Sequence, residues 1–225
     1  MVTIFVYRNG EATEVHDIEP AWVQPSSGAT LWVDLAAPDA GESAILASVF
    51  GFHELAIEDA LSESHHPKIE AYDGYLYLIL HGIDFRAAEH QFATHDTDFF
   101  LAPNYLVSVH HGTTRAIPAT RDLLRKNSRI LAEGTPALLH RIVDLMIEHC
   151  RPEVEKLEDR IDAIEKEVFD GAPPDIVRCL LDLKRDVGTL RRIVIPQRDV
   201  VGRLARREFP IIDNEVTYRF RDVYD

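Results

Sequence analysis

The chain has 225 residues, which is long for one domain and short for two, so we expect one domain with an appendage. Apolar residues make up 46% of it, which permits a packed core and excludes a disordered chain. Its 38 Asp/Glu and 24 Lys/Arg give a net charge of −14, which opposes nucleic-acid binding and favours cations or basic partners.

Features that the sequence lacks exclude further classes of protein. Two cysteines cannot form a disulfide scaffold, and they indicate a reducing, cytosolic setting. The N-terminus does not read as a signal peptide, and no run approaches the roughly 20 apolar residues of a membrane helix. Gly-x-Ser-x-Gly, Walker and Gly-x-Gly-x-x-Gly motifs are absent, so we do not expect an enzyme.

Residues 1–133 alternate strand and helix signals. Asn9-Gly10 and Asp73-Gly74 are typical of turns between paired strands. We expect strands at 2–7, 13–16, 31–35, 68–72, 75–83, 92–101 and 105–109, and helices at 40–50, 54–61 and 121–131. These elements predict an N-terminal α/β (α+β) sandwich domain over 1–133, built on a mixed sheet.

Residues 134–225 are helical in pattern, with Thr135 as the expected N-cap and Pro136 in the first turn. Two heptad seams flank the break at 171–174, and Pro152 is expected to kink the first arm. The first seam is Val154, Leu157, Ile161, Ile164 and Val168; the second is Ile176, Leu180, Leu183, Val187, Leu190 and Val194. Two such seams predict an antiparallel hairpin with arms ~50 Å long, projecting beyond the α/β body.

The charges of the two arms are complementary. The first arm is mainly acidic and the second mainly basic, so we expect attraction across the hairpin to fix its pairing. Internal pairing is also our expectation for the basic stretch 191–207, ahead of contact with lipid or nucleic acid. A further helix begins at Asn214 and reaches Asp225 without a stop signal, so we expect it to continue as a stalk in a longer protein.

Three segments carry a family resemblance. They are FHELAIEDAL at 52–61, HPKIEAY at 66–72 and YRFRDVYD at 218–225. In this order, with a long hairpin between the last two, they resemble the CorA family of magnesium and cobalt channels, of which the zinc transporter ZntB is a close relative. The resemblance implies a cytosolic, metal-sensing domain of an inner-membrane pentamer, whose membrane part would follow this segment.

The resemblance also implies metal ligands. Asp222 matches the family's stalk acid, which shares a divalent ion with an acid of a neighbouring subunit, and Asp144 matches a second site on the first long helix. An ungapped match puts Arg86 at the position of the neighbouring acid, with Asp84 two residues earlier. Either Arg86 replaces the metal by pairing with Asp222, or the loop shifts so that Asp84 serves. The ion implied is Mg²⁺, or else Co²⁺ or Zn²⁺.

Two other classes stay open from the residues alone. His90, His95, Asp96 and Asp98 could form the zinc site of a soluble metal-dependent hydrolase. A helical-hairpin adaptor without a metal role is the third reading. His140, Asp144 and Glu148 lie at i, i+4 and i+8, so they share a helix face that is either a cation site or a solvated polar stripe.

Overall fold

The computed structural model describes residues 1–62, 66–86, 91–112, 114–171 and 174–225, and for 84–86 and 91 it describes the backbone alone. The strands are β1 Val2–Arg8, β2 Glu11–Val15, β3 Thr30–Ala36, β4 Lys68–Tyr72, β5 Tyr75–Arg86, β6 Gln91–Leu101 and β7 Tyr105–His110. Short 3-10 helices occupy Pro20–Val23 and Pro25–Ser27, and the α-helices are α1 Ala40–Ser43, α2 Ile45–Ser48, α3 Glu54–Leu61, α4 Ala116–Lys126, α5 Arg129–Ala132, α6 Thr135–Phe169, α7 Ile176–Leu204 and α8 Asn214–Tyr224.

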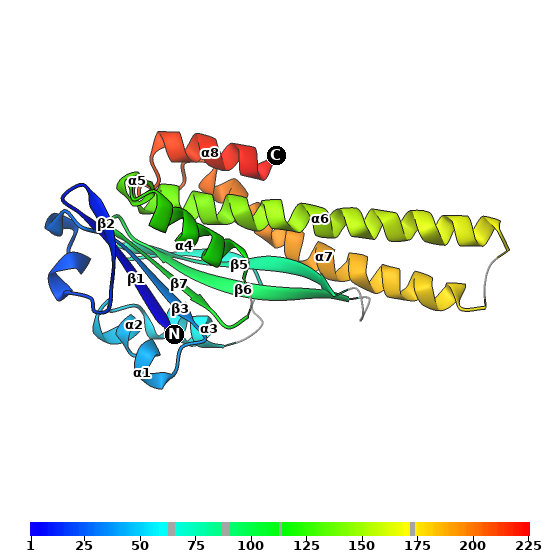
Figure 1. Cartoon of the computed structure of the whole chain (residues 1–225), viewed down its shortest axis with the longest axis horizontal. Coiled ribbons are helices and arrows are strands. Elements are labelled where there is room, and N and C mark those ends of the chain that lie inside the picture. Colours follow the sequence, from blue (N-terminus) through cyan, green and yellow to red (C-terminus); the bar gives the residue numbers. More distant parts are fainter. Residues whose placement is uncertain (63–65, 87–90, 113, 172–173) are drawn as a thin grey trace.

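One mixed sheet organises the N-terminal part. Its strand order is β2-β1-β3-β7-β6-β5-β4, with β3 and β7 parallel and the other neighbours antiparallel. Helices cover both faces of the sheet (Figure 1). Alternate side chains of each strand therefore enter different cores: Trp32 shares one with Leu138 of α6 and Phe220 of α8, whereas Leu31 shares the other with Leu46 of α2. The predicted α/β sandwich with a mixed sheet is confirmed.

Several predicted boundaries are wrong in detail. The helix expected at 40–50 is broken into α1 and α2, and that expected at 121–131 is divided between α4 and α5. Thr135 is not the N-cap of α6: Gly134 takes that position, with a φ of 94° that favours glycine. The Thr135 hydroxyl instead donates to the Ala102 carbonyl oxygen at 2.6 Å, which ties the start of α6 to the end of β6.

The hairpin of α6 and α7 extends well beyond the end of the sheet (Figure 1). With 35 residues, α6 is about 52 Å long, and it runs as one helix through Pro152. Among the described helices, none is both long enough and apolar enough to cross a bilayer.

The second predicted seam is buried only in part. Its members Leu190 and Leu183 belong to the cluster around Leu157 of α6, whereas Leu180, Val187 and Val194 are 44–46% exposed. Ile193, which lies outside the predicted seam, is buried. Contacts with the sheet and with α6 determine which side of α7 is buried. Gln197 lies on that side: its Oε1 accepts from the His81 N–H at 2.7 Å, and its Nε2 donates to the His81 carbonyl at 3.2 Å. A heptad count cannot show that an amide must face a strand at that point.

The expected charge pairing across the hairpin is also wrong. In the described parts of the arms, the ion pair that joins them is Arg160 with Asp186 at 2.6 Å, an arginine of the acidic arm with an acid of the basic arm. Asp186 is only 2% exposed, so this pair lies inside the hairpin.

Candidate metal centre

The C-terminal helix α8 presents Asp222 to solvent. Asp213 caps the helix, since its Oδ1 accepts from the Val216 N–H at 2.8 Å. Val216 and Phe220 are 3% and 0% exposed and anchor one face of α8 in the core shared with α6 and α7. Asp222 lies one turn after the exposed Tyr218, so helical periodicity puts it on the outer face.

Asp222 is the carboxylate of α8 without a partner in the described chain. Glu215 is occupied by Arg219, which also binds Glu133, at 2.6 and 2.8 Å. Both hydrogen bonds raise the pKa of Arg219, and the bond to Glu133 has the larger effect. Arg221 stacks over the Tyr218 ring with 4.7 Å to its centroid. An exposed carboxylate left open in this way can bind a hard cation together with an acid from another chain.

The helical face of His140, Asp144 and Glu148 does not form one site. The His140 ring meets Phe220 edge-on, with 5.1 Å between the ring centroids, and burial lowers the pKa of His140. The imidazole is therefore used to pack α6 on α8. Asp144 is half-buried and makes no hydrogen bond or ion pair with a described side chain, so it can act only as an isolated ligand on this chain.

The two candidates for the partner of Asp222 lie at the end of β5. The backbones of Asp84 and Arg86 pair with Ala93 and Gln91 of β6. Their side chains lie outside the described part of the chain. Both alternatives, Asp84 as a ligand and Arg86 as a substitute for the metal, therefore stay predictions.

The geometry gives no support to the hydrolase alternative. Asp98 is 2% exposed and accepts a hydrogen bond from the Tyr77 hydroxyl within the core between the sheet and α1–α3. Burial raises the pKa of Asp98 to about 8, against the lowering effect of the Tyr77 hydrogen bond. His95 and Asp96 are successive residues of a strand and point to opposite faces, and His90 lies outside the described residues. The described residues hold no group of three metal-ligating side chains.

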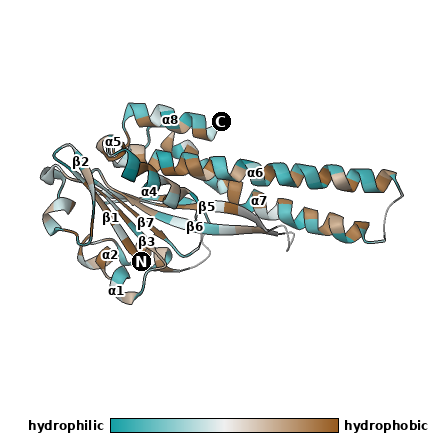
Figure 2. Cartoon of the chain, viewed as in Figure 1, coloured by the Kyte–Doolittle hydropathy of each residue, from teal (hydrophilic) through white to brown (hydrophobic). Residues whose placement is uncertain are grey.

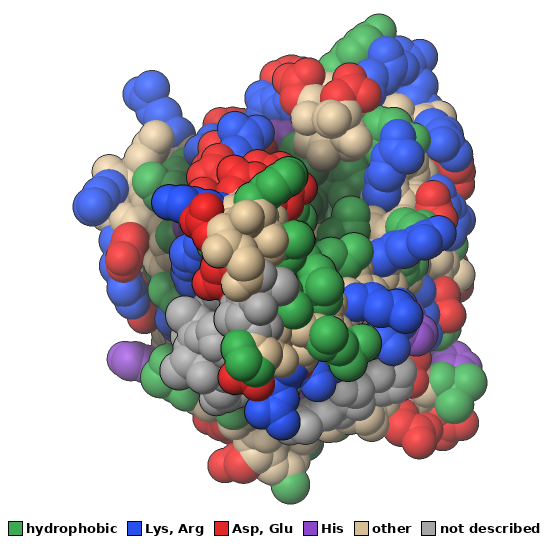
Figure 3. Space-filling view, turned by 90° about the vertical axis from the view of Figure 1, so that its right-hand side faces the viewer, with side chains coloured by type: hydrophobic (Ala, Val, Ile, Leu, Met, Phe, Trp, Pro, Cys, Tyr) green, Lys and Arg blue, Asp and Glu red, His purple; other side chains and the backbone are tan. Residues whose placement is uncertain are grey.

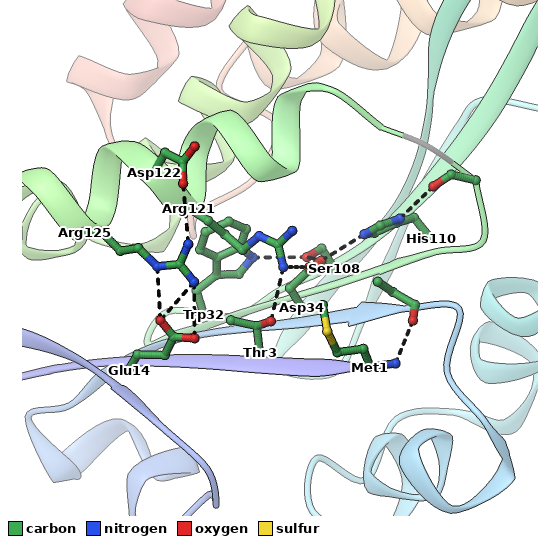
Figure 4. A network of polar contacts seen from close by, with 12 residues as sticks. Met1, Thr3, Glu14, Trp32, Asp34, Ser108, His110, Arg121, Asp122 and Arg125 are labelled. Carbon is green, nitrogen blue, oxygen red and sulfur yellow. Dashed lines mark hydrogen bonds and ion pairs between the residues drawn. The ribbon is translucent and has the colours of Figure 1, made fainter.

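The structure contains a buried polar network that the sequence alone did not predict (Figure 4). Asp34 of β3 lies beside Ser108 of β7, whose hydroxyl donates to Asp34 Oδ1 at 2.7 Å and accepts from Trp32 Nε1 at 3.1 Å. His110 and Arg121 approach the Asp34 carboxylate at 3.4 and 3.7 Å. Asp34 is 1% exposed, and the basic side chains of His110 and Arg121 lie beside its carboxylate.

This network is structural in its chemistry, although it contains serine, histidine and aspartate. A nucleophilic serine must be open to its substrate, but Ser108 is 0% exposed and its hydroxyl is held between Asp34 and Trp32. The signal in the sequence is a single acid within the apolar run of β3, Leu31-Trp32-Val33-Asp34-Leu35, which demands a buried cation nearby.

The chain has recognisable relatives. Residues 27–225 match a family model described as CorA-like Mg²⁺ transporter protein. The putative metal ion transporter YfjQ of Bacillus subtilis is 32% identical over 194 residues, covering 86% of this chain and 60% of that protein. The cobalt/magnesium transport protein CorA of Thermotoga maritima is 28% identical over 177 residues, covering 78% and 50%. The chain spans about half to three-fifths of the length of these curated relatives.

Solved structures share the fold. The soluble domain of CorA from Methanocaldococcus jannaschii aligns with a TM-score of 0.81 at 20% identity, covering 98% of this chain and 86% of that chain. The ZntB cytoplasmic domain from Vibrio parahaemolyticus aligns with a TM-score of 0.71 at 16% identity, covering 99% and 85%. The resemblance carried by the segments 52–61, 66–72 and 218–225 is confirmed.

Proposed function

The chain belongs to the CorA-like Mg²⁺ transporter family, and from this premise we propose that it is the metal-sensing, cytoplasmic part of a divalent-cation transporter of the inner membrane. The ion we propose is Mg²⁺, with Co²⁺ and Zn²⁺ as alternatives, because relatives are named as cobalt/magnesium and zinc transport proteins. The membrane portion would follow α8. The proposed assembly is a homo-oligomer, a pentamer in the whole protein.

The observation that carries this proposal is the exposed carboxylate of Asp222, which has no partner among the described residues and lies on a helix whose other charges are occupied. Mg²⁺ keeps several waters and takes one or two protein carboxylates, so an acid from each of two copies suits it. Asp84 is our proposed partner of Asp222, and Asp144 is a proposed second ligand position on α6.

Ion binding at such a boundary is linked to assembly. An ion bound between copies stabilises only the arrangement in which the acids face one another, by RT ln(1 + [L]/Kd), or about 1.4 kcal/mol per site at ten times Kd. When the ion leaves, facing carboxylates repel and favour a more open arrangement. The state of the assembly then reports the divalent-ion concentration to whatever follows α8.

Magnesium should stabilise the chain through Asp222. Saturating MgCl₂ should raise the melting temperature by about 4 °C, since roughly 1.4 kcal/mol per site corresponds to a few degrees in a chain of this length, or it should promote self-association. The Asp222→Ala variant should lose most of this response. Differential scanning fluorimetry and sedimentation velocity measure both quantities.

The matched control is Glu11→Ala, which removes an exposed carboxylate of β2 that has no ion pair with a described residue. Both substitutions change the net charge equally, so general electrostatic effects of Mg²⁺ cancel. An equal response in Asp222→Ala, Glu11→Ala and the unaltered chain contradicts the proposed site.

A further inference from the structure

The outer face of α7 is both apolar and basic. Six of the thirteen large hydrophobic side chains that are exposed in the described chain lie on this helix: Val177, Leu180, Leu181, Val187, Val194 and Ile195. Figure 2 shows hydrophobic residues on the part of α7 that projects beyond the sheet. Lys184 and Arg191 lie among them at helical spacing. An exposed apolar surface of this kind indicates a binding partner.

Three basic side chains of this face have no ion-pair partner in the described chain, whereas the nearby Arg185 pairs with Asp182 at 2.5 Å. Arg178, Lys184 and Arg191 are exposed and form no ion pair with any described residue. Residues 176–204 hold seven Lys/Arg and three Asp/Glu, a net charge of +4 within a chain of net charge −14. The partner should therefore be acidic.

The chain itself offers such a surface on α6. Residues 155–170 hold seven Asp/Glu against three Lys/Arg, a net charge of −4. Glu155, Asp159 and Asp162 are exposed, share one helix face and have no ion pair within the described chain. Seen toward the tip of the hairpin, a group of Asp and Glu side chains lies on one side and Lys and Arg on the other, with hydrophobic side chains between them (Figure 3).

These two surfaces cannot meet within one hairpin. The arms face one another through Leu157, Leu190 and the Arg160–Asp186 pair, which leaves the acidic face of α6 and the basic face of α7 outward. A two-fold contact of α7 with α7 would oppose Lys184 and Arg191 with their like-charged equivalents. A head-to-tail contact instead matches opposite charges at every junction, and such contacts form a ring where the rotation between copies closes.

Gly188 marks where a neighbouring backbone can come close. It lies in the middle of α7, is exposed, and borders an open hollow lined by Leu181, Lys184, Arg185 and Arg192. A Cβ at this position meets nothing within 4 Å, so no contact inside the chain requires a glycine. Glycine weakens a helix interior, but it lets a second helix approach.

We propose that the outer face of α7, centred on Lys184, Gly188 and Arg191, docks on the acidic outer face of α6 in a second copy of this chain. The inference rests on the proposed homo-oligomer and names the surface that joins its copies. It does not depend on the divalent-ion site, so the two can fail separately.

Charge reversal on each arm tests the contact. One variant carries Lys184→Glu and Arg191→Glu, and the other carries Asp159→Lys and Asp162→Lys. Sedimentation equilibrium of the 225-residue chain at low salt, with EDTA present to remove divalent ions, measures self-association. Each variant alone should associate about tenfold or more weakly than the unaltered chain, because like charges then face one another. An equimolar mixture of the two should recover association, because acidic α7 then meets basic α6.

Two further variants separate docking from folding. Gly188→Gln should raise the thermal stability of the helix but weaken association. Lys126→Glu with Arg129→Glu reverses two exposed charges on α4 and α5, and should leave association unchanged.

Three results overturn the proposal. The first is an unaltered chain that stays monomeric at the highest attainable concentration. The second is loss of association in the α7 variant that mixing does not recover, which points to a contact of α7 other than with α6. The third is a chain that does not self-associate but binds phosphatidylserine vesicles through Lys184 and Arg191, which makes this face a membrane contact.

Discussion

Replacing Arg121 with methionine should lower the free energy of unfolding by about 3–5 kcal/mol. Arg121 reaches Asp34 from α4, at 3.7 Å from Oδ2, and also donates to Thr3 Oγ1 at 3.2 Å (Figure 4). Asp34 is 1% exposed, so loss of the guanidinium leaves a buried carboxylate with less compensation. Urea denaturation at neutral pH measures the loss.

The neighbouring arginine is the matched control. Arg125 lies one turn further along α4 and pairs with Glu14 at 3.1 Å, but both side chains are about half exposed. Arg125→Met should therefore cost only ~0–1 kcal/mol. Adding Asp34→Asn to Arg121→Met should recover part of the lost stability, since the buried charge is then removed as well. Equal losses in the two arginine variants, or no recovery, contradict a charge-compensating role for Arg121.

The stability of the chain should fall with rising pH through Asp98. Its pKa is raised to about 8 in the folded state, chiefly by burial, against roughly 3.9 for an unfolded aspartate. Between these two values the folded state holds a proton that the unfolded state releases. The stabilisation is therefore complete below about pH 4 and is lost as pH rises toward about 8, at about 1.4 kcal/mol per pH unit.

Asp98→Asn isolates this effect. Asparagine keeps an acceptor for the Tyr77 hydroxyl and cannot ionise, so the variant should lose the slope contributed by this residue. Urea denaturation of both proteins at pH 5, 6 and 7 gives the difference in unfolding free energy, in which histidine titrations cancel. The unaltered chain should lose about 1.4 kcal/mol per pH unit relative to the variant. Parallel pH profiles contradict the assignment.

The sheet was predictable because strands carry strong local signals. Apolar, β-rich runs in β1 and β5 and alternation in β6 predict these strands, and turn residues at 9–10 and 73–74 predict the antiparallel pairing of β1 with β2 and of β4 with β5. The parallel pairing of β3 with β7 joins residues that are more than 70 positions apart, so no local pattern indicates that Asp34 meets Ser108. A still larger separation of 116 positions hides the contact of Gln197 with His81.

The hairpin was predictable in its existence, but the side of α7 that it buries was predictable only in part. Heptads in α6 and α7 predict two long helices, yet Leu180, Val187 and Val194 are exposed in this chain. A helix with apolar residues around much of its circumference can bury only one side in a two-helix arm. Our proposed docking of α7 on a second copy gives the remaining side a partner, which one sequence cannot indicate.

The candidate site was predictable only in part. The position of Phe220 in the core sets the helical phase of α8, and Asp222, two residues later, falls on the outer side. The other ligand belongs to a different copy in the proposed assembly, so neither periodicity nor spacing within one chain can identify it. The domain boundary at 133–134 likewise stays a prediction.

A crystal of this chain grown with CoCl₂ tests the central claim most directly. Data collected at the cobalt absorption edge should show an anomalous peak bound to the Asp222 carboxylate and to an acid of a neighbouring copy, with Asp84 as the expected ligand. Asp222 facing solvent far from every neighbouring copy, or paired with Arg86 and without a peak beside it, would contradict divalent-ion sensing by this chain.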